Sequence, residues 1–104
     1  MAAPSTAIDP LGNTVYLLPE VHFSQNDEKG IYDDVTKVIS KPAALIEVIE
    51  NGETHYFYLR SVGWNRSLLV VSRFKNDRWE AFRLVQNPPT DLMSALLKKG
   101  KQVL

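Results

Sequence analysis

The sequence predicts an α+β domain in which a four- to five-stranded antiparallel β-meander packs against two α-helices. Residues 44–85 contain four consecutive segments rich in β-forming side chains, with three short turns between them. One amphipathic helical segment precedes this run and another follows it. The length of 104 residues fits one domain with a modest core.

Composition excludes several classes of site. The formal net charge is zero, so binding to nucleic acid would need a local basic patch. Cysteine is absent, which excludes disulfides and cysteine-ligated metals, and the two histidines lack metal-ligand spacing. We therefore expect no metal and no cofactor. Because no apolar run reaches the roughly 18 residues of a membrane helix and no signal peptide is recognisable, we expect no membrane contact.

The N-terminal part divides into a lead-in and the start of the domain. Residues 1–13 contain Pro4, Pro10 and Gly12, and we interpret them as a flexible lead-in to a domain spanning 14–104. Residues 14–18 favour a short edge strand, which Pro19 ends. The conformation of residues 20–24, which include His22, stays open.

Two helices are expected from apolar residues at helical spacing. The first spans 30–40 and ends before Pro42. Its apolar stripe consists of Ile31, Val35, Val38 and Ile39. The second begins at a cap formed by Thr90 or Asp91 and ends at Gly100, which suits a left-handed cap. Its stripe consists of Leu92, Met93, Leu96 and Leu97.

The turn at Asn51-Gly52 sets the register of the first hairpin. If these residues form the loop, Val48 faces His55 and Ile46 faces Phe57, and facing residues share one side of the sheet. The predicted core side carries Ala44, Ile46, Val48, Phe57 and Leu59. The other side carries Leu45, Glu47, Tyr56, Tyr58 and Arg60.

A second hairpin turns on Asn76-Asp77. Ser72 then faces Ala81, Val70 faces Arg83, and an Arg73–Glu80 ion pair lies near the rim of the core side. We expect both helices to cover the core side and to leave the other face partly open. That open face carries Glu47, Tyr56, Tyr58, Arg60, Ser72, Phe74, Trp79 and Arg83.

The open face suggests RNA binding, because arginine forks bind phosphate and aromatic rings stack on unpaired bases. The alternative is that tyrosine and arginine merely suit an exposed pleated surface. His22 is a candidate general acid or base, or else a surface residue, and we interpret His55 as structural.

The layout resembles the phage-associated barnase–EndoU–colicin–RelE-like nuclease domains, which occur at the C-terminus of phage head morphogenesis proteins and in polymorphic toxins. The segments that carry the resemblance are TVYLLPEVHF, VIENGETHYFYLR, SLLVVSRF and the closing RWEAFRLVQNPPTDLMSALLKKGK. Together they run from about Thr14 to Lys101. The chain departs from the family in having no Ser or Thr on the last strand, where Ala81 and Arg83 lie.

The resemblance implies metal-independent RNA cleavage through attack by the ribose 2′-hydroxyl, in the cytoplasm of a bacterial host. We expect His22, Arg60, Ser72 and Arg83 to be catalytic, and Tyr56, Tyr58 and Trp79 to bind RNA. Expected partners are RNA and either a phage structural protein or an immunity protein. Two alternatives remain: a non-catalytic phage module of the same fold that binds protein or nucleic acid, and an unrelated interaction domain whose aromatic face contacts protein.

Overall fold

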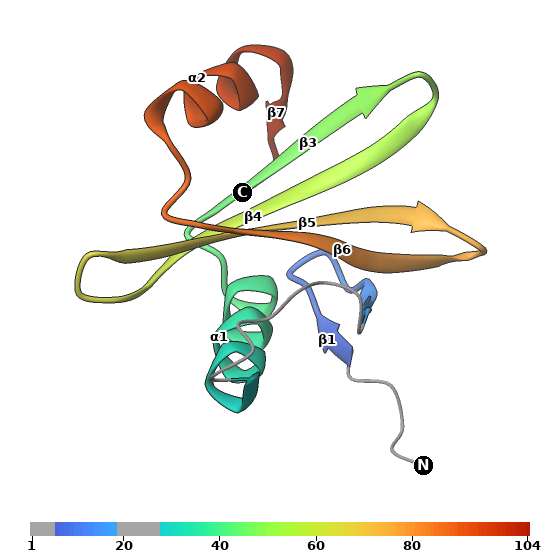
Figure 1. Ribbon diagram of the computed structural model, residues 1–104. Helices are drawn as coiled ribbons and strands as arrows, with labels where there is room; N and C mark the ends of the chain where they lie inside the picture. Colours follow the sequence, from blue (N-terminus) through green and yellow to red (C-terminus); the bar gives the residue numbers. More distant parts are fainter. Residues whose placement is uncertain (1–5, 19–27) are drawn as a thin grey trace.

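The computed structural model describes residues 6–18 and 28–104, apart from the side chains of residues 28–32. Its elements are β1 (Thr6–Ile8), β2 (Thr14–Leu17), α1 (Glu28–Ser40), β3 (Ala44–Glu50), β4 (Glu53–Gly63), β5 (Arg66–Lys75), β6 (Arg78–Gln86), α2 (Thr90–Lys99) and β7 (Lys101–Gln102). The described strands form a seven-stranded sheet in the order β1-β2-β6-β5-β4-β3-β7 (Figure 1). The α+β class and the β3-β4-β5-β6 meander are confirmed.

The sheet is larger than predicted and is mixed rather than purely antiparallel. β2 lies between β1 and β6 instead of at an edge, and it runs parallel to β6 with Val15 beside Trp79. β1 adds one edge, and β7 adds the other by pairing with β3. β1 has three residues and β7 has two, so neither is long enough to show a periodic pattern.

The second half of the predicted lead-in is ordered within the fold. After β1 the chain turns around the carboxylate of Asp9, which accepts hydrogen bonds from the backbone nitrogens of Leu11 (3.0 Å) and Asn13 (2.8 Å). Asp9 is only 3% exposed and Ala7 only 5%. Pro10 and Gly12 therefore mark a tight turn between β1 and β2, not a loose linker.

Both predicted hairpin turns are confirmed. Asn51 and Gly52 have φ values of 52° and 76°, and Asn76 and Asp77 have values of 56° and 61°, as a two-residue type I′ turn requires. The first hairpin has the predicted register, with Val48 beside His55 and Ile46 beside Phe57.

The second hairpin follows the predicted register only near its turn. Ser72 pairs with Ala81 as expected, but a bulge then shifts the ladder, so that Arg83 pairs with Val71 instead of Val70. Val70 is 1% exposed in the core beneath α1. An uninterrupted ladder would have placed the Arg83 guanidinium in that core, where an unpaired charge is very costly. The bulge moves Arg83 to the other face.

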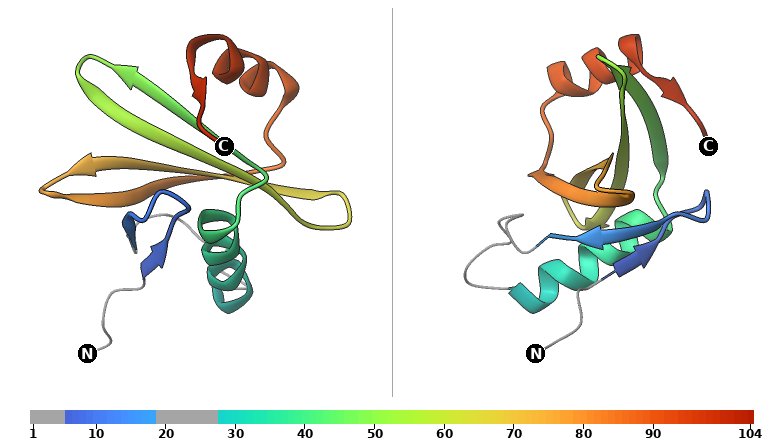
Figure 2. Two further views of the ribbon diagram at one scale, coloured as in Figure 1. Left: turned by 180° about the vertical axis from the view of Figure 1, so that it is seen from behind. Right: turned by 90° about the vertical axis from the view of Figure 1, so that its right-hand side faces the viewer.

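The two helices lie on opposite faces of the sheet, not on one face as predicted (Figures 1 and 2). Each covers its own core. The α1 core contains Ala7, Val15, Leu17, Val35, Val38, Ile39, Leu45, Tyr58, Leu68, Val70 and Ala81. The α2 core contains Ile46, Val48, Leu69 and Leu96. The face that we expected to be open is therefore a second core face.

The helices follow their predicted stripes with two corrections, both in α2. The first is that Pro89 is the N-cap and no side chain caps the helix, so the predicted cap at Thr90 or Asp91 is wrong. In α1, Val35, Val38 and Ile39 are at most 1% exposed. At the C-terminal end of α1, the backbone nitrogen of Lys41 donates a hydrogen bond to the carbonyl oxygen of Lys37. In α2, Leu96 is buried but Leu97 is 58% exposed, so the stripe is narrower than predicted. No helix in the described ranges is long and apolar enough to span a membrane.

Gly100 does not form the left-handed cap that we predicted, since its φ is −105°. It allows a close approach instead. A Cβ atom there would meet Ile46 Cγ2 and would lie 2.8 Å from the carbonyl oxygen of Leu96. Glycine therefore lets the chain leave α2 directly against β3.

Candidate functional site

The structure divides the predicted site between two faces. Tyr58 and Ser72 are both 0% exposed in the α1 core, where no base could stack on the tyrosine ring. The Tyr58 hydroxyl donates to Asp9 Oδ2 at 2.8 Å, and Ser72 Oγ donates to the Tyr58 hydroxyl at 3.2 Å. These two side chains and Asp9 form a buried polar network that fixes the β1–β2 turn to the sheet.

Three more predicted site residues lie on the α1 face. The guanidinium of Arg60 donates through Nη1 to the carbonyl oxygen of Lys41 at 2.6 Å. The Tyr56 hydroxyl donates to Glu47 at 3.0 Å. The Tyr56 ring stacks on Trp79, with 4.8 Å between the ring centroids. Arg60 thus secures the chain after α1, while Tyr56 and Trp79 pack against the edge of the α1 core.

Arg83 lies on the α2 face because of the bulge, so it does not meet Arg60 or Ser72. His22 falls outside the described residues, and its predicted role stays a prediction. Arg60, Ser72 and Arg83 therefore do not form one constellation. The prediction of an Arg73–Glu80 ion pair is also wrong. The two residues are paired across the ladder, but Glu80 accepts a hydrogen bond from Arg78 Nε at 2.9 Å.

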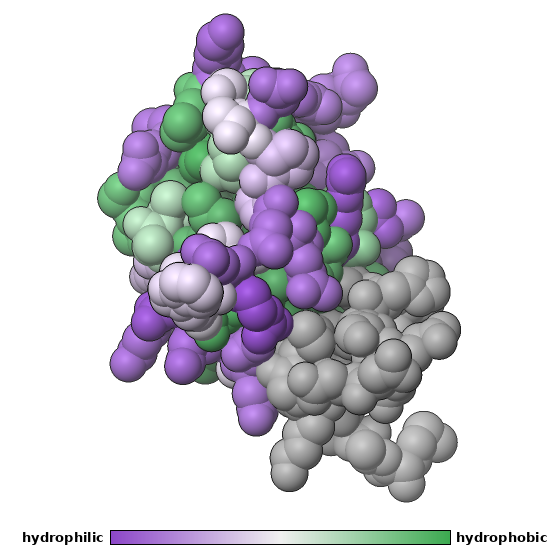
Figure 3. Space-filling view, turned by 60° about the vertical axis from the view of Figure 1, so that its left-hand side comes forward, coloured by the Kyte–Doolittle hydropathy of each residue, from purple (hydrophilic) through white to green (hydrophobic). Residues whose placement is uncertain are grey.

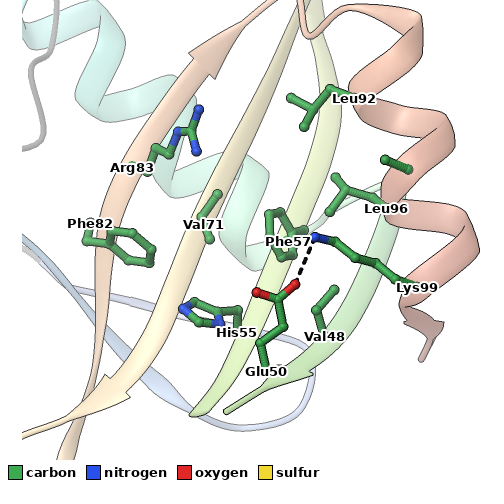
Figure 4. Close-up of a pocket in the computed structure, with 11 residues that line it drawn as sticks. Val48, Glu50, His55, Phe57, Val71, Phe82, Arg83, Leu92, Leu96 and Lys99 are labelled. Carbon is green, nitrogen blue, oxygen red and sulfur yellow. Dashed lines mark hydrogen bonds and ion pairs between the residues drawn. The ribbon is translucent and has the colours of Figure 1, made fainter.

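A pocket of about 250 Å³ lies between α2 and the sheet, and Arg83 belongs to its lining (Figure 4). We call it the α2 pocket. It is lined by Val48, Glu50, His55, Phe57, Val71, Phe82, Arg83, Leu92, Ala95, Leu96 and Lys99. Strands β3 to β6 supply its floor and α2 supplies one wall. An apolar cavity with a few charged groups at its rim is the usual form of a small-ligand site.

His55 supplies the imidazole of this lining, and imidazole is the side chain that most often serves as a general acid or base. Its Nε2 lies 2.9 Å from Glu53 Oε1. Because a carboxylate only accepts hydrogen bonds, this contact holds a proton on Nε2 and leaves Nδ1 as the exchanging nitrogen. The imidazole ring points toward Phe82, with 5.8 Å between the centroids (Figure 4).

Three cations lie in or beside the pocket that His55 lines. Arg83 lines the pocket, and Arg73 pairs with His55 across β4 and β5. The Arg73 guanidinium carbon lies 4.4 Å from the centroid of Phe82, in cation–π geometry. Lys99 reaches from α2 across the pocket and binds Glu50 at 2.8 Å (Figure 4). By this hydrogen bond and by its charge, Lys99 lowers the pKa of Glu50.

The described residues include no cluster of three or more histidine, cysteine, aspartate and glutamate side chains suited to a metal ion. The cations of the α2 pocket are instead arginine and lysine, which bind phosphate directly.

Sequence reasoning missed His55 because its partner Val48 is apolar, so the position was assigned to the core side. The assignment of the side was right. The position of α2 was the missing information, because only that helix turns this side into a pocket. One sequence signal was available: the predicted register already placed His55 on the side that also carried Arg73.

No protein-family model, curated protein or solved structure matches the chain in the comparisons made with it. The resemblance to phage-associated nuclease domains therefore stays a prediction.

Proposed function

We propose that the chain is a metal-independent RNA endonuclease whose site is the α2 pocket. The observation that carries this proposal is a pocket lined by one imidazole, one carboxylate and two cations, with a third cation on the strand beside the imidazole: His55, Glu50, Arg83, Lys99 and, in the ladder, Arg73. Cleavage of a ribose phosphodiester needs a proton acceptor, a proton donor and positive charge, and this set contains each of them.

In the proposed reaction, the Glu50 carboxylate accepts the proton of the ribose 2′-hydroxyl. The 2′-oxygen then attacks phosphorus, and the bond from phosphorus to the 5′-oxygen breaks. Protonated His55 gives its Nδ1 proton to the departing 5′-oxygen. The products are a 2′,3′-cyclic phosphate and a free 5′-hydroxyl, so no water or cofactor is consumed.

The cations serve the charge that develops on the phosphoryl oxygens. Arg83 is exposed at the pocket, and its planar fork matches two phosphate oxygens. The Arg73 guanidinium lies over the ring of Phe82, which lines the same pocket. Glu53 holds the imidazole in place through its contact with Nε2.

The test is cleavage of a short single-stranded RNA in EDTA by the wild type and four variants. We expect His55→Ala, Glu50→Gln and Arg83→Ala each to lower kcat/KM at least about a hundredfold, which is about 2.7 kcal/mol of barrier. Arg60→Ala is the matched control, because it removes an arginine from the opposite face. The proposal fails if the wild type does not cut, or if Arg60→Ala is as impaired as Arg83→Ala.

The second candidate is a non-catalytic module that binds a phosphate-containing ligand in the same pocket. The ion pair between Lys99 and Glu50 favours it, because this contact engages the carboxylate that the reaction needs as a base. Salt-dependent RNA binding without cleavage, weakened in Arg83→Ala, would support this function.

A further inference from the structure

The two hairpins of the meander diverge at their tips and leave a notch between them. The ladder between β4 and β5 ends at the pair His55–Arg73, while each hairpin continues to its own turn (Figure 1). The notch has a volume of about 400 Å³. We call it the hairpin notch; it is lined by Asn51, Gly52, Glu53, Thr54, Phe74 and Trp79.

One side of the hairpin notch is a braced aromatic surface. The Phe74 ring is edge-on to Trp79, with 5.3 Å between the centroids, and Trp79 is stacked in turn on Tyr56. Tyr56 is fixed by its hydrogen bond to Glu47. Phe74 nevertheless remains 49% exposed. An aromatic ring that is held from behind and free in front is suited to stacking with a planar ligand.

The opposite side of the notch is polar and comes from the β3–β4 turn. Asn51 and Glu53 are exposed and Thr54 is half-buried. Their amide, carboxylate and hydroxyl groups provide hydrogen-bond donors and acceptors across from Phe74. Because Gly52 has no side chain and nothing lies within 4 Å of where its Cβ would be, the turn leaves this side open. The chemistry fits a flat heterocycle with polar edges.

Glu53 joins the hairpin notch to the α2 pocket. It lines the notch, and its Oε1 lies 2.9 Å from His55 Nε2 in the pocket lining. The aromatic side of the notch belongs to the α1 face, so a phosphate in the α2 pocket and a base at the notch would be joined through the gap between the two hairpins, beside Glu53.

We propose that the hairpin notch binds one base of the RNA by stacking on Phe74, next to the phosphate held in the α2 pocket. This inference rests on the proposed function, since the α2 pocket supplies the phosphate site. It adds the base-binding surface, and it makes Phe74 the residue that carries base affinity while Glu53 couples base binding to the position of His55.

The test uses tryptophan fluorescence. The chain has two tryptophans, so Trp64→Phe, at a position that is 91% exposed, leaves Trp79 as the single reporter beside Phe74. In this background we would titrate adenosine, guanosine, cytidine and uridine, with ribose 5-phosphate as the probe that lacks a base. We expect at least one nucleoside to quench Trp79 emission and ribose 5-phosphate to leave it unchanged.

Phe74→Ala should weaken the nucleoside affinity at least tenfold, and Phe74→Tyr should keep it. Leu97→Ala is the control, because Leu97 is somewhat more exposed than Phe74 and lies on α2. The inference is overturned if no nucleoside quenches, if ribose 5-phosphate quenches equally, or if Phe74→Ala binds as the parent does. Nucleoside binding without RNA cleavage would uphold the notch and refute the ribonuclease. Cleavage without nucleoside binding would support the ribonuclease and refute base binding at the notch.

Discussion

The burial of Tyr58 shows that a sheet face predicted to be exposed is a core face. The alternation of side chains along the strand placed Tyr58 correctly on the side opposite Ile46 and Val48, and its hydroxyl suggested a solvent-exposed surface. In the fold its ring is buried, because Asp9 and Ser72 satisfy the hydroxyl. A buried tyrosine with a partner contributes to stability as an aliphatic residue does, and its polar end also selects a single arrangement.

The stability should depend on pH in the alkaline range because of Tyr58. Burial, aided by the Asp9 carboxylate, raises the pKa of Tyr58 well above its ordinary value. Unfolded tyrosine loses its proton near pH 10, whereas the folded residue keeps it, so the folded state binds more protons above that pH. The free energy of unfolding should therefore fall as pH rises above about 10, by up to about 1.4 kcal/mol per pH unit for this residue.

Tyr58→Phe should reduce the alkaline slope to the part that comes from Tyr56, whose pKa burial also raises, and should lower stability at pH 7 by about 1–3 kcal/mol, because Asp9 loses a donor. Urea unfolding at pH 7 and at several values above 10 measures both effects. Ser94→Ala, an exposed hydroxyl on α2, is the control and should stay within about 0.5 kcal/mol of the wild type. If the free energy of unfolding of Tyr58→Phe falls with pH as steeply as that of the wild type, another group causes the loss of stability at alkaline pH.

Lys99 should set the acidic limit of the proposed reaction. It lowers the pKa of Glu50, and a general base must be ionised, so cleavage by the wild type should persist below the ordinary glutamate pKa. Lys99→Met should move the acidic limb of the pH–rate profile to higher pH. Lys98→Met, a change in the neighbouring lysine, should leave it in place. If the limb is the same in both variants, Glu50 is not the base.

At the scale of elements, the bulge in β6 decides what the α2 pocket contains. Phe82 is the extra residue, and the pairs on either side of it are Ser72–Ala81 and Val71–Arg83. With the bulge, Phe82 and Arg83 both line the α2 pocket. Bulges commonly redirect side chains beside functional sites, and alternation alone cannot locate them. This is why the sequence prediction put Arg83 on the wrong face.

Deletion of Phe82 should convert the bulge into a regular ladder without moving Arg83. The pairs Ser72–Ala81 and Val71–Arg83 would become consecutive, and the loss of stability should not exceed about 2 kcal/mol. Deletion of Leu84 is the matched control, because it removes one residue from a regular part of the ladder. Either Val85 then moves to the other face of the sheet, or Arg83 enters the α1 core. Cross-strand nuclear Overhauser effects and urea unfolding measure these outcomes. A Phe82 deletion that unfolds the chain as readily as the Leu84 deletion would contradict the prediction.

Close packing at Gly100 fixes α2 to the sheet, and the pocket depends on that contact. Gly100→Ala would press a methyl group into Ile46 and against the Leu96 carbonyl, at a cost of about 1–3 kcal/mol. We expect a lower melting temperature together with loss of the Lys99–Glu50 contact. Gly63→Ala is the control, because nothing lies within 4 Å of its Cβ position. Equal effects of the two substitutions would refute the packing argument.

For the whole molecule, strong local patterns predicted most elements, and long-range contacts decided the rest. The two type I′ turns fixed both hairpins, and helical periodicity located α1 and α2. The covering of both faces was missed, although β5 offered a signal: Leu68, Leu69, Val70 and Val71 are consecutive and buried. An uninterrupted apolar strand is typical of a sheet covered on both sides.

The candidate site was predictable only in part for the same reason. Arg83 was identified, and the hairpin register alone puts His55 and Glu50 on one side, but Lys99 joins them only because α2 packs on the second face. Figure 3 shows one side of the molecule, on which groups of hydrophobic side chains lie between hydrophilic ones.

Removal of residues 1–13 should destabilise the entire domain. It takes away Ala7 and Asp9 from the α1 core and leaves the Tyr58 hydroxyl without its acceptor. We expect a loss of at least about 3 kcal/mol in urea unfolding, by combining the lost burial and hydrogen bonds. A chain that begins at Thr6 keeps β1 and serves as the control. If both chains are equally stable, the β1–β2 turn contributes nothing to the fold.

The parallel pairing of β2 with β6 also constrains how the chain is made. β2 leaves the ribosome well before β6, the strand that lies beside it, has been made. At a synthesis rate of roughly 5–20 residues per second, the apolar side of β2 stays without its neighbouring strand for several seconds. The meander can form first from local contacts, and β2 docks onto it last. Nascent-chain helpers that shield short apolar segments would act during this interval.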